Sequence, residues 1–321
     1  MHLLKPIRQH EFPADFLLAR LKGRSGRIRI DWNSLRAAAD PVAWGHPGFL
    51  VPYLRAHLED GPWKFLFHEF GWVRSRMNSR LRHIFFPVFL YFELFNLLAG
   101  LRCKEHGNLI GRIDFIGSYS LLDDSLFALI RTESSMERII DHLAQSFAHI
   151  APGFERAWQT YFQGGFSALD QAVFEVFFTH WSSRSLPVIL KTFLQQLVDT
   201  TNLLGLYKAM LWNVEAPPAT LPGGTLAPQS FVKAYEKGRM DTVLRKAGMS
   251  EVDPEQESGA GLESAVYLNL RKTLKRNIHE PSGVGYILYY IWEQYLFARR
   301  YSFMLRRKYS HEEFFQAMEL T

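Results

Sequence analysis

The feature that most constrains the fold is the segment 198–211, VDTTNLLGLYKAML, which mixes polar and apolar residues at helical spacing. Asp199 and Asn202 are three residues apart, so a helix places both side chains on one face. A carboxylate and an amide within an apolar helix each need a hydrogen-bond partner if they are buried. The pattern therefore predicts a helix whose polar pair binds a neighbouring segment. The run LPGGTL follows at 221–226.

Two pairs of similar but shorter sequence segments suggest internal repetition. The segment 93–102, ELFNLLAGLR, repeats the acid-x-x-Asn spacing in Glu93 and Asn96, at an offset of 202 − 96 = 106 residues. The run LDQAVF at 169–174 resembles LESAVY at 262–267, at an offset of 262 − 169 = 93. Together they favour three units of roughly a hundred residues, much longer than an ordinary solenoid repeat. We place them at 1–120, 121–224 and 225–321.

The periodicity of apolar residues predicts an all-α fold, because no segment alternates convincingly as a strand does. At 47% hydrophobic residues, the 321-residue chain has enough apolar side chains for a sizeable core. The clearest helix start is at Ser134 and Glu137, which have the spacing of a capping box. Helices are expected at 16–30, 63–82, from near Pro87 to 100, 134–150, 169–181, 188–211, 229–247, 262–278, 283–307 and 311–320. Loops are expected around 107–120 and over 248–261.

The apolar run at 84–100 is interpreted as a buried helix and not as a membrane span. It is short of the about 20 residues that a span needs, and Glu93 would lie near the centre of the bilayer. The single cysteine, Cys103, allows no internal disulfide, which favours a reducing, cytoplasmic compartment. The first residues carry charges and lack the apolar stretch of a secretory signal.

The charge distribution does not favour nucleic-acid binding. The net charge is +5, and basic residues cluster at 20–29, 74–82 and 299–308. Each cluster mixes cations with apolar residues, as amphipathic helices do, and no nucleic-acid-binding motif accompanies them. The turn at Gly223 and Gly224 is more typical of a helix connection than of a phosphate cradle.

No catalytic, cofactor or metal motif is recognisable, and we expect neither a cofactor nor a metal. His142 and His149 lie seven residues apart on one predicted helix, about 10 Å, which is too far for a shared ion without another element. A dispersed enzyme site that uses His142, Asp141 and Glu155 remains an alternative.

Several segments together resemble the C subunit of V-type and A-type rotary ATPases, called subunit d in the eukaryotic enzyme. The resemblance rests on DTTNLLGLYKAMLW at 199–212, LPGGTL after it, and the two echoed runs LDQAVF and LESAVY. The closing segment YYIWEQYLFARRYSFMLRRK at 289–308 and the opening FLLARLKGRSGR at 16–27 also resemble the family. In the third unit the acid-x-x-Asn positions fall on Phe297 and Arg300, so the polar pair is lost there.

The resemblance implies a funnel of three helical lobes around a pseudo-threefold axis. It implies a non-catalytic rotor subunit that joins the central stalk of the ATP-hydrolysing sector to the membrane rotor ring for ion translocation. It also implies one copy within a hetero-oligomeric complex, peripheral to the cytoplasmic face of the membrane. Candidate lobe-signature or partner-contact residues are Asn96, Arg102, Asp199, Asn202, Lys208, Gly223, Gly224 and Arg300.

Two interpretations of these residues stay open. Asn96 and Asn202 face the inside of the funnel and Asp199 braces helices with Lys208, or each is an ordinary polar residue of helix packing. A different function is also open, because a stand-alone helical scaffold or adaptor would have the same architecture.

Overall fold

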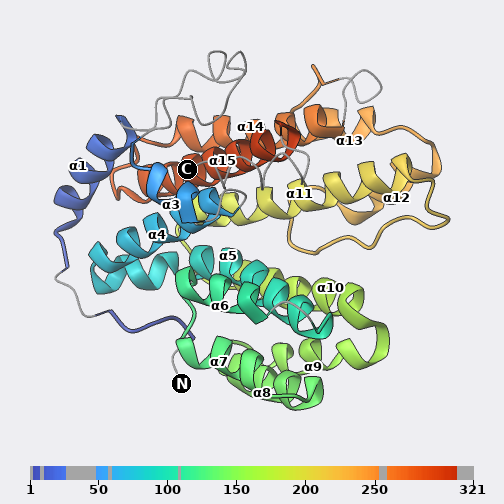
Figure 1. Cartoon of the computed structure of the whole chain (residues 1–321). Helices are drawn as coiled ribbons and strands as arrows, with labels where there is room; N and C mark the ends of the chain where they lie inside the picture. The colour runs from blue at the N-terminus through green and yellow to red at the C-terminus, as the bar shows by residue number, and fades with distance from the viewer. Residues whose placement is uncertain are drawn as a thin grey trace. The chain divides into compact units, whose positions relative to one another are not determined.

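The structure is a computed structural model, and it describes residues 3–7, 11–26, 48–56, 60–107, 110–252 and 259–308. All regular elements in these ranges are helices, as the sequence predicts, and one isolated antiparallel bridge pairs Leu4 with Leu122. The helices, shown in Figure 1, are α1 Ala14–Ser25, α3 Val51–Ala56, α4 Gly61–Arg76, α5 Ser79–Glu105, α6 Ile110–Tyr119, α7 Asp124–Thr132, α8 Met136–Ala148, α9 Gly153–Gln159, α10 Tyr161–Ser182, α11 Val188–Leu211, α12 Pro228–Glu236, α13 Asp241–Lys246, α14 Gly259–Arg276 and α15 Val284–Lys308.

The chain divides into two compact units, each built from separate stretches of sequence. Unit 1 comprises the described residues of Met1–Pro6, Ile84–Gly117 and Leu122–Tyr286. Unit 2 comprises those of Ile7–His83, Ser118–Leu121 and Ile287–Thr321. Helices α5, α6 and α15 therefore contribute residues to both units. The division into three lobes at 120/121 and 224/225 stays a prediction.

Unit 1 is a succession of helices in which neighbours along the chain pack on one another. Pairs α7–α8, α8–α9, α9–α10, α10–α11, α11–α12 and α12–α13 are in contact, and α14 returns to pack on α11. The second half of α11 forms a core with α12, α13 and the start of α14; its members include Leu203, Leu206, Phe231, Leu244 and Val266. Helix α11 is thus central to this unit.

Unit 2 has its own core, formed by α3, α4 and α15. Leu50, Leu54 and Phe65 pack with Phe297 and Tyr301, and all five are at most 5% exposed. Trp63 also donates a hydrogen bond from Nε1 to the Ser302 hydroxyl at 3.1 Å. These contacts join segments more than 200 residues apart in the sequence.

Helix α5 begins earlier than predicted, and Pro87 lies inside it. Asn78 supplies the start signal, because its side-chain oxygen accepts a hydrogen bond from the Leu81 N–H at 2.9 Å. The predicted helix 63–82 is accordingly interrupted at Met77, where α4 ends. Buried residues flank Pro87 on both sides, and this packing holds the turn that a proline weakens.

Two further expectations are corrected. The region 107–120 contains α6 where a loop was expected, and Ile113, Phe115 and Ile116 form its buried face. Its Gly117 packs against the Phe127 ring, where an added Cβ would lie 3.1 Å from the ring atoms. The N-cap of α8 is Ser135, not Ser134, and its hydroxyl accepts from the Arg138 N–H at 3.3 Å.

Most other helix predictions agree with the structure. The range of α11 is the predicted one, and the predicted helical region 229–247 consists of α12 and α13. Helix α10 starts before the predicted helix at 169, but non-helical Gly164 and Gly165 separate its first turn from the rest. The closing helix 311–320 and the central part of the loop 248–261 lie outside the described residues.

Helix α5 is long and apolar enough to cross a membrane by length and composition alone. However, 78% of its most apolar 18-residue window is buried inside the protein. Glu93 and Asn96 lie within it, fully buried and 9% exposed. These properties are typical of a core helix.

Candidate functional site

The carboxylate of Asp199 binds the loop that follows α11. Its Oδ2 accepts hydrogen bonds from the N–H of Thr225, at 3.0 Å, and from the Thr225 hydroxyl. Its Oδ1 accepts from the N–H of Leu226 at 3.1 Å. Asp199 is only 7% exposed, so these three donors replace the water that a carboxylate otherwise needs. The neighbouring segment that the sequence analysis predicts for Asp199 is therefore the end of the LPGGTL run.

Asn202 binds the beginning of the same run. Its Nδ2 donates to the Leu221 carbonyl at 3.0 Å, and its Oδ1 accepts from the Leu221 N–H at 2.7 Å. The amide therefore pairs with one backbone residue in both directions, as a neighbouring strand would. Asp199 and Asn202 together hold residues 221–226 against α11, and we call these eight residues the loop clamp.

Gly223 and Gly224 make this close approach possible. At Gly224 an added Cβ would lie 2.2 Å from Asp199 Oδ1 and 3.1 Å from Val198 Cγ1, so no larger residue fits. Gly223 has φ +91°, a conformation that L-residues rarely adopt. The N–H groups of Thr225 and Leu226 bind the protein's own carboxylate, which occupies the position that an anion would take in a phosphate cradle.

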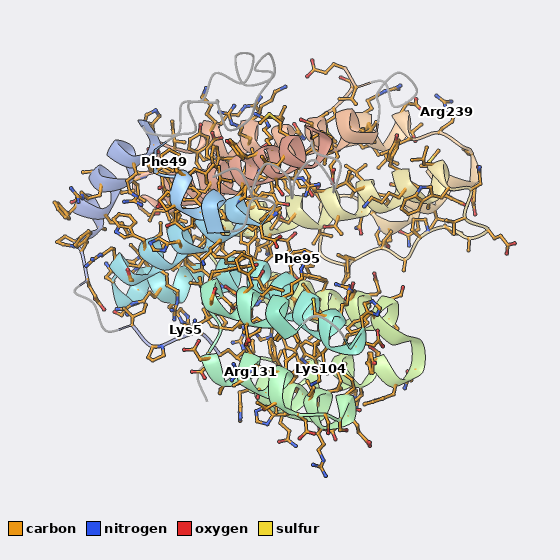
Figure 2. The ribbon with its side chains drawn as sticks, in the orientation of Figure 1. Lys5, Phe49, Phe95, Lys104, Arg131 and Arg239 are labelled. Carbon is orange, nitrogen blue, oxygen red and sulfur yellow. The ribbon has the colours of Figure 1, made fainter. Side chains whose placement is uncertain are left out.

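The second acid-x-x-Asn pair makes a different contact. On α5, Asn96 Nδ2 donates to Glu93 Oε2 at 3.1 Å, within one turn of the same helix. Phe95, between the two, is 49% exposed, and its ring centroid lies 4.8 Å from that of Phe174 on α10. Figure 2 labels Phe95. The equal spacing in sequence therefore does not produce equal partners.

Arg102, near the end of α5, is bound to α10. Its Nη2 donates to Asp170 Oδ2, and its guanidinium lies 5.2 Å from the centroid of the Phe166 ring. Burial raises the pKa of Asp170 above its usual range, and the neighbouring Arg102 charge opposes this rise. The other carboxylate oxygen, Oδ1, is buried without a hydrogen-bond partner. This pair links two helices, but it is less well satisfied than the loop clamp.

Lys208 and Arg300 lie apart from these contacts. Lys208 is exposed on the last turn of α11, and no ion pair joins it to Asp199 among the described residues. The expected bracing of helices by Asp199 with Lys208 is thus replaced by the binding of Asp199 to the loop. Arg300 is half-buried on α15, in unit 2, and Phe297 lies in the core of that unit.

Unit 2 contains a buried ionic cluster that the sequence analysis missed. Glu69 on α4 is 4% exposed and accepts hydrogen bonds from Arg24 of α1 and from the Tyr290 hydroxyl at 2.9 Å. Arg24 also lies 4.2 Å from the Trp72 ring centroid. Burial and the Glu69 charge raise the pKa of Tyr290. The available signal was that Glu69 stands among apolar residues on the helix face formed by Leu66, Phe70 and Val73.

The histidine and carboxylate candidates do not converge. No group of three histidine, cysteine or acidic residues that could hold a metal exists among the described residues. Asp141 accepts a hydrogen bond from Gln159 Nε2 at 2.7 Å, Glu155 is exposed, and Cys103 is buried. The side-chain hydrogen bonds described above link helices to one another and hold a loop against α11.

Comparison with known families gives one match. The model of the family "ATP synthase (C/AC39) subunit" matches residues 56–296, about three quarters of the chain. No individual curated protein matches the sequence. The matched region contains both acid-x-x-Asn helices, the loop clamp and the Arg102–Asp170 pair.

Proposed function

This chain belongs to the ATP synthase (C/AC39) subunit family and is a subunit of a V/A-type ATPase; we propose that it couples the central stalk to the membrane rotor ring. In this role it binds the stalk of the ATP-hydrolysing sector at one end and the ring at the other. It passes torque for ion translocation and carries out no chemical reaction itself. One copy works within the complex, on the cytoplasmic face of the membrane.

The observation that carries this proposal is the extent of the family match. It covers 56–296 and therefore includes the polar pairs of α5 and α11 and the segments that echo each other, 169–174 and 262–267. A match confined to one helix pair would support a shared packing motif only. The wide match supports a shared role of the whole body.

The contacts within unit 1 suit a part that transmits torque. Such a part must resist deformation, because a compliant body would store the work of rotation as strain. Five hydrogen bonds, two between Asn202 and Leu221 and three to Asp199, fix residues 221–226 of the connection between α11 and α12 to the central helix. We propose that α5, α11 and α15 are corresponding helices of three lobes that form a funnel.

The candidate residues divide by exposure. Asn96, Asp199 and Asn202 are buried and hydrogen-bonded inside unit 1, so they shape a lobe and are closed to a partner. Arg102 and Arg300 are only half-buried. We propose that these two arginines contact the stalk or the ring, because a planar guanidinium on a partly exposed helix face suits an acidic partner.

The test is capture of partners by the full-length tagged chain from detergent-solubilised membranes of its source, with mass spectrometry of what is retained. The proposal expects both stalk and rotor-ring subunits. Arg300→Glu should reduce that recovery, whereas the matched control Lys246→Glu, an exposed cation on α13, should leave it unchanged. Recovery of neither subunit from the unmodified chain would reject the coupling role and favour a stand-alone adaptor.

A second measurement distinguishes a role in coupling ATP hydrolysis to ion transport from simple presence in the complex. A complex reassembled without this chain should still hydrolyse ATP in its soluble sector but should lose ATP-driven ion transport. Restoring the chain should restore transport. Transport that continues at its full rate without the chain would contradict the coupling role even if the chain binds both sectors.

A further inference from the structure

The C-terminal end of α11 displays three apolar side chains to solvent. Leu211 is 57% exposed, Trp212 68% and Val214 45%. Among the described residues, Trp212 is the only exposed tryptophan. We call Leu211, Trp212 and Val214 the apolar tip. Exposing this much apolar surface in a stretch of four residues costs free energy unless a partner covers it.

The backbone holds the apolar tip in a fixed geometry. The N–H of Val214 bonds the Ala209 carbonyl at 3.0 Å, and the N–H of Asn213 bonds the Met210 carbonyl at 3.2 Å. Asn213 has φ +49°, so this is a Schellman cap with asparagine in the left-handed position. The Tyr235 hydroxyl of α12 donates to the Val214 carbonyl. The exposed side chains therefore project from an ordered helix end.

Three lysines lie on the two helices that carry or contact the apolar tip. Lys208 precedes Trp212 by one helical turn, and Lys233 and Lys237 flank Tyr235 in the sequence. All three lysines are exposed and form no ion pair within the described residues. Over 203–249 there are six Lys and Arg and three Asp and Glu, so the net charge is 6 − 3 = +3. Arg239, on the connection between α12 and α13, projects outward in Figure 2 but is already paired with Asp241.

We propose that the apolar tip and its lysines bind the surface of an anionic lipid bilayer. Tryptophan is suited to the headgroup region, because its ring is apolar and its N–H is polar. Lysines beside it attract anionic headgroups. A stable protein interface needs roughly 20–30 residues a side, whereas the tip offers three side chains on one helix end. This inference is independent of the coupling role, since any subunit beside a membrane could make the contact.

The test is flotation of the purified full-length chain with vesicles of 70% phosphatidylcholine and 30% phosphatidylserine, against pure phosphatidylcholine, at low salt. The chain should float with the anionic vesicles only. Trp212→Ala should weaken binding about tenfold through lost apolar contact. Lys208→Gln should weaken it about fivefold through one lost charge. The matched control is Val188→Ala at the other end of α11, where an 82% exposed valine should be dispensable.

All of these positions are exposed, so the variants should keep the circular dichroism spectrum of the unmodified chain. The proposal is overturned if the unmodified chain ignores anionic vesicles, or if it binds them and Trp212→Ala binds equally well. It is also overturned if the detergent-purified ATPase complex, free of lipid, protects a Trp212→Cys thiol from labelling. That last result would show that a protein subunit covers the tip. Each of these results leaves the partner-capture experiment unaffected.

Discussion

The two acid-x-x-Asn pairs of unit 1 have the same spacing in the sequence, but their side chains form hydrogen bonds with different partners. On α5, Glu93 and Asn96 bond to each other within one helical turn. On α11, Asp199 and Asn202 direct their side-chain bonds outward to the two ends of the loop 221–226. The difference arises from the chain segment that packs back on each helix after it ends. After α11, a turn with two adjacent glycines brings backbone N–H and carbonyl groups next to the helix, where Asp199 and Asn202 bind them.

This comparison shows that a motif on one helix fixes the need for partners but not their identity. A buried carboxylate must find donors, and the nearest ones satisfy it. On α5, where no glycine-rich loop follows the pair, the amide of Asn96 is one donor to Glu93. On α11, where such a loop follows, its backbone N–H groups are the donors to Asp199, and the loop is held against the helix. The loop clamp of α11 should therefore be far more sensitive to substitution than the pair on α5.

The largest effect is expected at Gly224. In Gly224→Ala the new methyl group would lie 2.2 Å from Asp199 Oδ1, so the loop must move away and its bonds to Asp199 must lengthen or break. A buried carboxylate that loses its donors costs about 4 kcal/mol. Urea denaturation followed by circular dichroism should show this loss. Hydrogen exchange should quicken first at Thr225 and Leu226.

The control for that substitution is Gly205→Ala on α11 itself. An added Cβ there meets nothing within 4 Å. Alanine favours a helix interior by about 0.5–1 kcal/mol over glycine, so this variant should be more stable than the unmodified chain. If both variants are equally destabilised, helix disturbance and not loss of the loop clamp is the cause.

Removal of the carboxylate should have the next largest effect. Asp199→Ala leaves the N–H groups of Thr225 and Leu226 and the Thr225 hydroxyl without their acceptor, which costs about 3 kcal/mol. A double-mutant cycle with Thr225→Val isolates the hydroxyl contact. Zero coupling energy between Asp199 and Thr225 would contradict the clamp geometry.

Truncation of the corresponding polar pair on α5 should lower the free energy of unfolding by less. Asn96→Ala removes one hydrogen bond to Glu93 and should cost about 1–2 kcal/mol. The measurement is the same denaturation series, so the two helices are compared directly. A loss for Asn96→Ala as large as that for Asp199→Ala would mean that the two pairs are energetically equivalent despite their different bonding.

The sequence predicted the need for this clamp better than its form. The helix 188–211 and its two buried polar residues follow from periodicity and from the cost of an unpaired carboxylate. That the LPGGTL run supplies the donors depends on the path of the chain after Leu211, which turn residues permit but do not determine. Glu69 shows the same limit, because its partners Arg24 and Tyr290 are separated from it by 45 and 221 residues.

Errors in the helix predictions also have local causes. Pro87 and the glycines of 107–120 disfavour a helix when only the local sequence is considered. Tertiary packing overrides such preferences when the flanking residues are buried. Leu81 and Phe85 before Pro87, and Ile113 and Ile116 within α6, are at most 5% exposed. Family resemblance, in contrast, needed no packing information, because LPGGTL and the acid-x-x-Asn spacing are visible in the sequence.

The smallest effect tests the polar link at the other end of α5, between Arg102 and Asp170. Because burial raises the pKa of Asp170 in the folded chain, the folded state holds the proton more tightly than the unfolded state. This contribution to stability is lost as pH rises from 3.8, the usual value, through the raised pKa. Asp170→Asn should therefore gain on the unmodified chain across that window and keep a constant difference above it.

Asp241→Asn is the control of opposite sign. A hydrogen bond from Arg239 lowers the pKa of Asp241, so its stabilising contribution is present above 3.8 and is lost as pH falls through the lowered pKa. Asp241→Asn should therefore be less stable than the unmodified chain by a constant amount above pH 3.8, and this deficit should shrink as pH falls below 3.8. Relative to the unmodified chain, Asp241→Asn thus loses stability as pH rises, whereas Asp170→Asn gains it. Urea midpoints measured between pH 3 and 7 compare them. If both differences change with pH in the same direction, the Arg102 charge outweighs burial at Asp170, and α5 is bound to α10 by a favourable ion pair.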